Sequence, residues 1–308
     1  MKRHILLLAL AGFCFSAASA VAAPLKVTAT LSTFADLVKS VGGEHVEVSS
    51  IASPKFNPHF IEPKPSDVLK VKRAELFVHA GLDLELWRGP LLDAAGNREV
   101  MPGGPRELAL SQGIALLEVP DHPVSRAEGD IHIYGNPHYW VDPENARKMA
   151  KAICDKLSAV DPSHEADYRR NFSEWSGRLD GKISEWRLKL APYQGEEVVG
   201  YHNSWPYFLR FSGMKMEEFL EPKPGIPPTP KQVQFIEQYI REKKIRLFIQ
   251  ETYFPQGESE ALARQTGIQV LLLCQNVREV PEAADYAAMM DYNVNQLARA
   301  LGAKEGKR

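Results

Sequence analysis

Cysteine is scarce in this sequence, with three residues in a chain of 308. Cys14 lies in an apolar stretch near the N-terminus, and the rest of the chain holds only Cys154 and Cys274. A small domain held together by disulfides needs more cysteines than this. We therefore predict a fold stabilised by hydrophobic cores, with Cys154 and Cys274 as two separate buried thiols rather than one bridge.

Long apolar runs are missing as well, apart from one at the start. The run over residues 5–15 is too short, and too soon interrupted, to span a bilayer. It follows Lys2 and Arg3, and small residues ending at Ala22 come after it. This order is typical of a secretory signal peptide, so we predict cleavage after Ala22 and a mature protein that is soluble.

Cys14 raises the alternative of a lipoprotein leader. A small residue usually precedes a cysteine that is lipidated, whereas Phe13 is bulky. The sequence therefore favours a cleaved signal peptide without a lipid anchor.

The chain also lacks an excess of positive charge. It has 37 basic and 39 acidic residues, and loss of Lys2 and Arg3 with the leader makes the net charge about −4. This balance argues against nucleic acid or an anionic membrane as a partner. The remaining chain of about 286 residues is long enough for two ordinary domains.

Internal repeats and low-complexity tracts are absent, and strands alternate with helices instead. A helix capped by Ser32 or Thr33 is predicted through Val41, and another begins at Pro65-Ser66-Asp67. Repeated strand–helix–strand units are typical of parallel sheets covered by helices. The predicted strands are residues 25–31, 46–52, 75–80, 197–201, 245–250 and 269–274.

The middle of the chain predicts one long helix. Pro162 is placed where a first helical turn tolerates it, and Pro192 ends the helix. We therefore predict an α/β fold of two lobes joined by one long rigid helix, with an N-terminal lobe over 23–142, a helical segment over 143–192 and a C-terminal lobe over 193–308. The apolar positions recur every three or four residues, as one face of an α-helix requires: Tyr168, Phe172, Trp175, Leu179, Ile183, Trp186 and Leu190.

Three histidines share one kind of setting. His59 and His138 each follow an Asn-Pro pair, and His202 follows the first predicted strand of the second lobe. In open α/β sheets, ligands bind in the crevice outside the carboxyl ends of the strands. Three neutral imidazoles that converge there suit zinc and other late first-row metals. We predict a metal site in the cleft between the lobes.

The other histidines have weaker claims. His79 lies within a predicted strand, where we expect a residue of the core or its rim, and His45, His122 and His164 lie in polar stretches that we expect to be exposed. His132 is near His138 in the sequence and could be an accessory ligand, but we do not include it in the predicted set.

The segments Asn57-Pro58-His59, Asn136 to Pro143 and Tyr201-His202-Asn203 stand in this order along the chain. With them, the sequence resembles the zinc- and manganese-binding solute-binding proteins of bacterial ABC importers. The resemblance covers essentially the whole mature chain, and its motifs are long and ordered. The matching segments are Asn57-Pro58-His59, residues 62–67 and 81–87, Asn136 to Pro143, Tyr201-His202-Asn203, residues 248–251 and residues 286–297.

The resemblance implies the fold, the site and the partners. Family members hold one metal between two α/β lobes with three or four protein ligands, which carries the first three to His59, His138 and His202. It further implies a periplasmic location and an inner-membrane permease with its ATPase as partners. A periplasmic metallochaperone is a further candidate partner, and we expect a monomer.

The chain departs from the family at two points. The long histidine-rich and acid-rich loop of many zinc-type members is replaced by residues 120–135, which hold only His122 and His132. An aspartate that serves other members as fourth ligand is also missing. Cys274 stands at that place and is our predicted fourth ligand, with Glu251 or a water molecule as competitor.

The donor types favour zinc over manganese, because manganese sites tend to include carboxylates. We therefore predict high-affinity capture of zinc and its delivery to an ABC transporter, and no enzymatic activity. The first alternative is a manganese receptor of the same family. A zinc hydrolase with a three-histidine site, or a receptor for a sugar or amino acid, is a more distant alternative.

Overall fold

Two separate parallel sheets form the framework of the structure, a computed structural model that describes residues 23–122, 132–221 and 225–302. The predicted leader, residues 1–22, lies outside the described residues. The first sheet has the strand order β2–β1–β3–β4, and the second has the order β5–β6–β7. The strands are β1 (Leu25–Ala29), β2 (Val46–Ser50), β3 (Leu76–His79), β4 (Glu107–Ala109), β5 (Val199–Gly200), β6 (Leu247–Glu251) and β7 (Gln269–Leu273).

The apolar alternation predicted six of these strands and missed β4. With only three residues, β4 is too short to show an alternating pattern. Each neighbouring pair is parallel, as the strand–helix–strand order requires.

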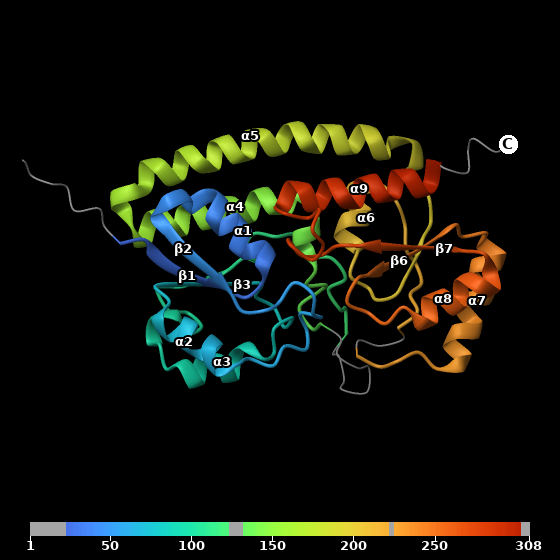
Figure 1. Cartoon of the computed structure of the whole chain (residues 1–308), viewed down its shortest axis with the longest axis horizontal. Coiled ribbons are helices and arrows are strands. Elements are labelled where there is room, and N and C mark those ends of the chain that lie inside the picture. The colour runs from blue at the N-terminus through green and yellow to red at the C-terminus, as the bar shows by residue number, and fades with distance from the viewer. Residues whose placement is uncertain (1–22, 123–131, 222–224, 303–308) are drawn as a thin grey trace, which may run out of the picture.

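The helices surround the two sheets (Figure 1). Figure 1 shows α2 and α3 beside the first sheet, α7 and α8 beside the second, and α5 and α9 along the top of the molecule. The helices are α1 (Ser32–Gly42), α2 (Pro65–Arg73), α3 (Arg88–Ala95), α4 (Pro143–Val160), α5 (Glu165–Leu190), α6 (Pro206–Ser212), α7 (Pro230–Lys243), α8 (Gly257–Thr266) and α9 (Tyr286–Gly302).

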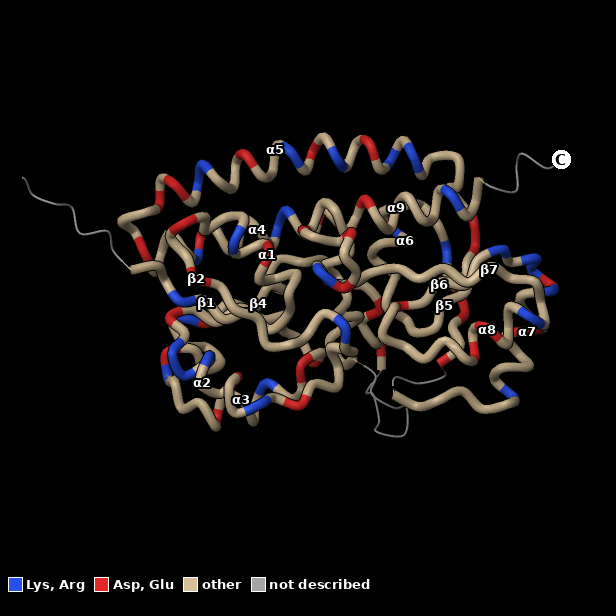
Figure 2. Tube along the Cα trace, viewed as in Figure 1, with Lys and Arg blue, Asp and Glu red and all other residues tan. Residues whose placement is uncertain are grey.

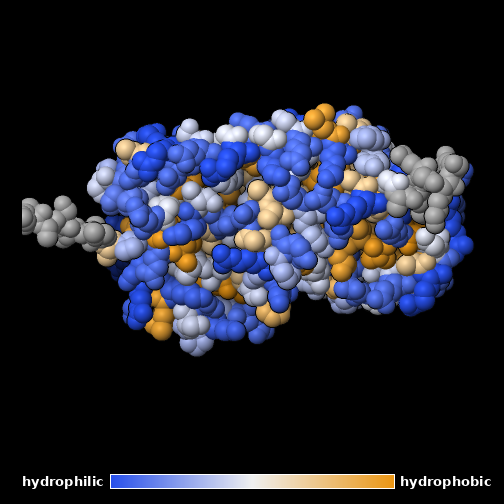
Figure 3. All heavy atoms as spheres, turned by 45° about the horizontal axis from the view of Figure 1, so that its top comes forward, coloured by the Kyte–Doolittle hydropathy of each residue, from blue (hydrophilic) through white to orange (hydrophobic). Residues whose placement is uncertain are grey.

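The predicted long helix is confirmed as α5, which has 26 residues. Its buried side chains include Leu179, Ile183 and Trp186, and it packs against α1, α4 and α9. Acidic and basic residues alternate along its length (Figure 2). The face of the molecule in Figure 3 is largely hydrophilic, with scattered apolar side chains. Helix α5 therefore spans both lobes with one side in the core and the other in water.

This arrangement confirms the predicted fold of two α/β lobes with parallel sheets and a connecting helix. The exact lobe limits stay a prediction, because α9 returns from the second lobe to pack against α1 and α5. The two thiols of Cys154 and Cys274 are buried and unbridged, as predicted. Within the described ranges, no helix is both long and apolar enough to cross a bilayer.

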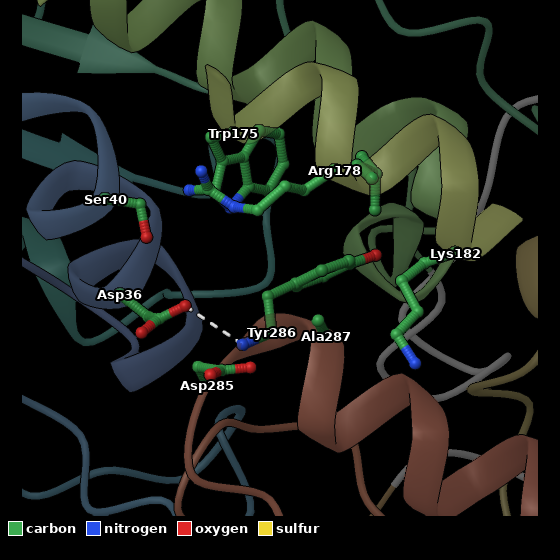
Figure 4. Close-up of a pocket in the computed structure, with 9 residues that line it drawn as sticks. Asp36, Ser40, Trp175, Arg178, Lys182, Asp285, Tyr286 and Ala287 are labelled. Atoms are coloured by element: carbon green, nitrogen blue, oxygen red, sulfur yellow. Dashed lines mark hydrogen bonds between the residues drawn. The ribbon is translucent and has the colours of Figure 1, made fainter. Parts of the chain in front are cut away.

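The two lobes also meet at the start of α9. Asp36 on α1 accepts a hydrogen bond of 3.0 Å from the backbone nitrogen of Tyr286, the first residue of α9 (Figure 4). Both residues line a cavity of about 260 Å³, to which α5 contributes Trp175, Arg178 and Lys182. Burial raises the pKa of the Asp36 carboxyl to about 6. The folded chain therefore holds this proton more tightly than the unfolded chain, and stability declines as the pH rises from about 4 to about 6.

Asp36→Asn is expected to stabilise the metal-free protein at pH 7.5 by roughly 1 kcal/mol and to have no effect at pH 4. Asparagine keeps an oxygen for the Tyr286 amide but cannot ionise. Thermal unfolding of both proteins at the two pH values measures the difference. Asp36→Ala serves as the control, because it loses the acceptor at either pH. An equal effect of Asp36→Asn at both pH values would contradict the assignment.

Candidate metal centre

His59, His138 and His202 come together between the two sheets. His59 lies in the loop after β2, His138 directly precedes a short 3-10 turn (Tyr139–Val141), and His202 follows β5. The ring centroids of His59 and His138 are 5.1 Å apart, and His202 lies 5.4 Å and 5.5 Å from them. All three side chains are buried. The structure thus brings together three of the four residues predicted as ligands.

The spacing of His59 and His138 fits a shared ion. Their Nε2 atoms are 3.2 Å apart. Two nitrogens bound to one tetrahedral zinc at 2.0–2.1 Å would be about 3.3–3.4 Å apart. Burial, together with the neighbouring imidazoles, holds the pKa of both rings well below 6.5. Both rings are therefore neutral at pH 7, which is the form that binds a metal.

Each Asn-Pro-His motif aims its histidine by two means. Proline fixes its own backbone φ angle just before the histidine. In addition, the Asn57 side chain accepts a hydrogen bond of 3.0 Å from the His59 backbone nitrogen, and Asn136 does the same for His138. These side-chain turns hold the histidine backbone relative to the asparagine two residues earlier. This role of the asparagines was missed in the sequence.

A carboxylate holds the ring of His202. Its Nδ1 lies 2.5 Å from Oε2 of Glu221. A carboxylate only accepts hydrogen bonds, so Nδ1 carries the hydrogen and the lone pair is on Nε2. Glu221 is beside His202 because its backbone nitrogen donates to the carbonyl of Tyr201 at 2.8 Å. Sequence reasoning missed Glu221, which lies 19 residues from its partner and in no motif.

A fourth histidine lies in the same cluster. The ring of His132 is 5.0 Å from that of His59 and 6.3 Å from that of His138, measured between centroids. Among the described residues, His59, His132 and His138 form a group whose possible ligand atoms all lie within 4.8 Å of one another. His132, which we left out of the predicted ligand set, is thus part of the cluster. His202 is not in the group of close ligand atoms, although its ring lies 5.4 Å and 5.5 Å from those of His59 and His138.

Cys274 also lies outside the group of close ligand atoms. Its backbone nitrogen and carbonyl both bond to the side chain of Asn293 on α9, at 2.8 Å and 2.7 Å. The thiol is buried in the hydrophobic core, and burial raises its pKa further. The side chain of the next residue, Gln275, lies beside His138. Cys274 as a ligand stays a prediction, and its placement argues against it.

Glu251, the predicted competitor, is fully buried at the end of β6. Burial raises the pKa of its carboxyl to about 8, so in the metal-free protein the group is mostly neutral at pH 7. It too lies outside the group of close ligand atoms found in the described part of the chain.

The remaining histidines lie elsewhere. His79 is buried and bonds Glu107 at 2.7 Å, as expected for a core residue. His45 and His164 are half-buried rather than exposed, because their rings stack at 3.9 Å between centroids and each bonds an aspartate.

Comparison with known proteins decides the family. The model of a family described as zinc-uptake complex component A, periplasmic (ZnuA), matches residues 27–300. The chain belongs to this family. The match covers both lobes, the connecting helix and all of the histidines discussed above.

Individual relatives agree with this assignment. The chain is 27% identical to the manganese ABC transporter substrate-binding lipoprotein PsaA of Streptococcus mitis, over 90% of this chain and 89% of the relative. It is similar to the crystal structure of ZnuA, with 26% identity, a TM-score of 0.76 and coverage of 90% of this chain and 99% of the other. It also shares the fold of the Pseudomonas aeruginosa protein FpvC in complex with Mn²⁺, with 21% identity, a TM-score of 0.77 and coverage of 91% and 99%.

Membership of the ZnuA family establishes the general role. The protein is a metal-binding substrate-binding protein of an ABC importer, acts outside the cytoplasm, works with a membrane permease and its ATPase, and is not an enzyme. The family thus gives no support to the hydrolase alternative. Several relatives are named lipoproteins, so the family does not support our argument against a lipid anchor on Cys14.

Proposed function

We propose that this protein captures zinc in the periplasm, with His59, His138 and His202 as ligands, and delivers it to the importer. The observation that carries the proposal is the convergence of three buried imidazoles, two of which have Nε2 atoms 3.2 Å apart. His202 presents its Nε2 lone pair because Glu221 occupies Nδ1. We further propose that residues 1–22 are removed on secretion. A monomeric state and supply by a metallochaperone stay predictions.

The donor set is what favours zinc over manganese. Imidazole nitrogens suit zinc, whereas manganese prefers carboxylate, carbonyl and water oxygens. Among the described residues, the group of close ligand atoms is that of His59, His132 and His138, and His202 adds a further imidazole beside them, so the donors are all nitrogen. The family description names zinc, but PsaA is named for manganese and FpvC has been crystallised with Mn²⁺, so the names of relatives do not decide the metal.

A competition titration tests the choice of metal. The purified mature chain is stripped of metal and titrated with zinc and with manganese against chelators of known affinity. We expect zinc to bind at least about 100-fold more tightly, since the imidazoles match only one of the two ions. Tighter binding of manganese would instead support a manganese receptor. Copper serves as a reference, because it binds nitrogen sites more tightly than zinc whatever the cellular cargo.

Glu221→Gln is expected to lower zinc affinity about 10-fold to 100-fold, the range typical of a lost carboxylate behind a histidine ligand. Glutamine has the same shape but no negative charge, so it no longer fixes the hydrogen on Nδ1 or raises the basicity of Nε2. Equilibrium competition with a chromogenic chelator measures the change. Glu218→Gln on the same segment is the control. An unchanged zinc affinity would show that Glu221 does not contribute to zinc binding through His202.

A further inference from the structure

We propose that His132 is the fourth metal ligand and that a site of four imidazoles is what selects late first-row cations over manganese. This inference rests on the proposed function of the same site and extends it to the residue that decides specificity. In this proposal His132 occupies the fourth position, for which the sequence had indicated Cys274, Glu251 or water.

The orientation of the His132 ring suits a metal ligand. Its Nδ1 bonds Oδ1 of Asp83 at 2.8 Å, so the hydrogen is on Nδ1 and the lone pair on Nε2. That Nε2 is buried and makes no hydrogen bond to any described residue. A buried polar atom without a partner costs free energy, which a bound cation would recover. A ring nitrogen of His132 lies within 4.8 Å of ring nitrogens of His59 and His138.

The carboxylate of Asp83 fixes both the ring of His132 and the backbone of the next residue, Ile133. Oδ1 accepts from the ring, and Oδ2 accepts from the backbone nitrogen of Ile133 at 2.9 Å. The ring and the backbone beside it are therefore fixed to one residue of the first lobe. A side chain that is both held in this way and largely buried is preorganised for binding. His122 gives the contrast, because its side chain is 60% exposed.

His132 and His202 form a matched pair. Each ring is held through Nδ1 by a carboxylate, Asp83 in one case and Glu221 in the other. Each carboxylate bonds Nδ1, and Nε2 of the same ring is left for the ion. Together the two carboxylates supply two negative charges, which offset the charge of a divalent cation. The charge of the ion is balanced without any carboxylate in direct contact with it, so all four donors remain nitrogen.

An all-nitrogen site has a clear preference among metals. Zinc, nickel, copper and cobalt accept four imidazoles, whereas manganese loses the oxygen ligands that it favours. The side chain of His132 is 10% exposed, so it is the outermost of the four. Water can take its place if it is removed, which leaves a three-histidine site open to ions that retain water.

Two substitutions and one control test the role of His132. His132→Ala removes the donor, His132→Asp offers oxygen instead, and His122→Ala is the matched control on the same segment. Zinc and manganese affinities of the full mature chain are measured by competition. The cobalt-substituted proteins are compared by absorption, because four-coordinate cobalt absorbs visible light far more strongly than five-coordinate or six-coordinate cobalt.

We expect His132→Ala to lower zinc affinity about 10-fold to 100-fold and to change the positions and intensities of the visible cobalt bands, because one nitrogen donor is lost. His132→Asp should narrow the ratio of zinc to manganese affinity by at least about 10-fold, since it supplies an oxygen donor. His122→Ala should match the unsubstituted protein in every measurement.

The inference is overturned if His132→Ala leaves the zinc affinity and the cobalt spectrum unchanged. It is also overturned if the unsubstituted protein shows a sulfur-to-cobalt charge-transfer band that Cys274→Ser removes, since that band assigns the fourth position to the thiolate. Neither result touches the proposed function, which fails if the unsubstituted protein does not bind zinc tightly or binds manganese more tightly than zinc.

Discussion

Replacing His59, His138 or His202 with alanine is expected to lower zinc affinity by at least about 100-fold, more than the loss of a carboxylate behind a ligand. Each substitution removes a nitrogen donor at the centre of the cluster, where the side chains are buried. The loss of His202 also leaves Glu221 buried without its imidazole partner. Competition with a chelator of known zinc affinity measures the three variants under one set of conditions.

Two histidines away from the cluster serve as controls for these variants. His122→Ala removes an exposed ring, and His164→Ala removes a half-buried ring that bonds Asp161. Both are expected to bind zinc as the unsubstituted protein does. If either control loses as much affinity as the variants of the cluster, zinc is not held by His59, His138 and His202.

Periodicity in the sequence was enough to predict most of the fold. The apolar face of α5 recurs every three or four residues over its whole length, and prolines lie near both ends. The strands of both sheets alternate strongly enough to be found, except for the three residues of β4. What periodicity does not contain is the packing between segments far apart in the chain. The return of α9 onto α1 and α5 is therefore visible only in the structure.

The site was predictable in part for the same reason. His59, His138 and His202 follow strand ends or share a motif, and strand ends meet at one edge of a sheet. Asp83 and Glu221 reach their histidines from 49 and 19 residues away, and nothing in the sequence marks those pairs. Asp83 in particular is what gives His132 its place, so without that contact the histidine looked like a loop residue.

The fourth position shows how one residue of register changes a site. Cys274 and Gln275 are neighbours just beyond β7, and they have different surroundings. The backbone of Cys274 is fixed to Asn293 of α9, and Gln275 lies against His138. A sequence argument cannot choose between adjacent residues at a strand end. The position of Cys274 is set by its hydrogen bonds to α9, and α9 is packed beside β7 by contacts between distant parts of the chain.

Zinc is expected to raise the melting temperature of the metal-free protein by on the order of 10 °C. A metal that binds only the folded chain stabilises it by about 4 kcal/mol at a thousandfold excess over the dissociation constant. For a chain of this size, each kilocalorie per mole raises the melting temperature by roughly 2–4 °C. Calorimetry of the chelator-treated protein with and without zinc measures the shift.

The shift should depend on ligands from both lobes, because His59 follows a strand of the first sheet and His202 a strand of the second. Zinc bound to both opposes the separate unfolding of either lobe, so the whole transition should move rather than one part of it. At the same free zinc concentration, His59→Ala and His202→Ala should each lose most of the shift, and magnesium should cause none. A variant that keeps the full shift would show that zinc stabilises the protein from some other place.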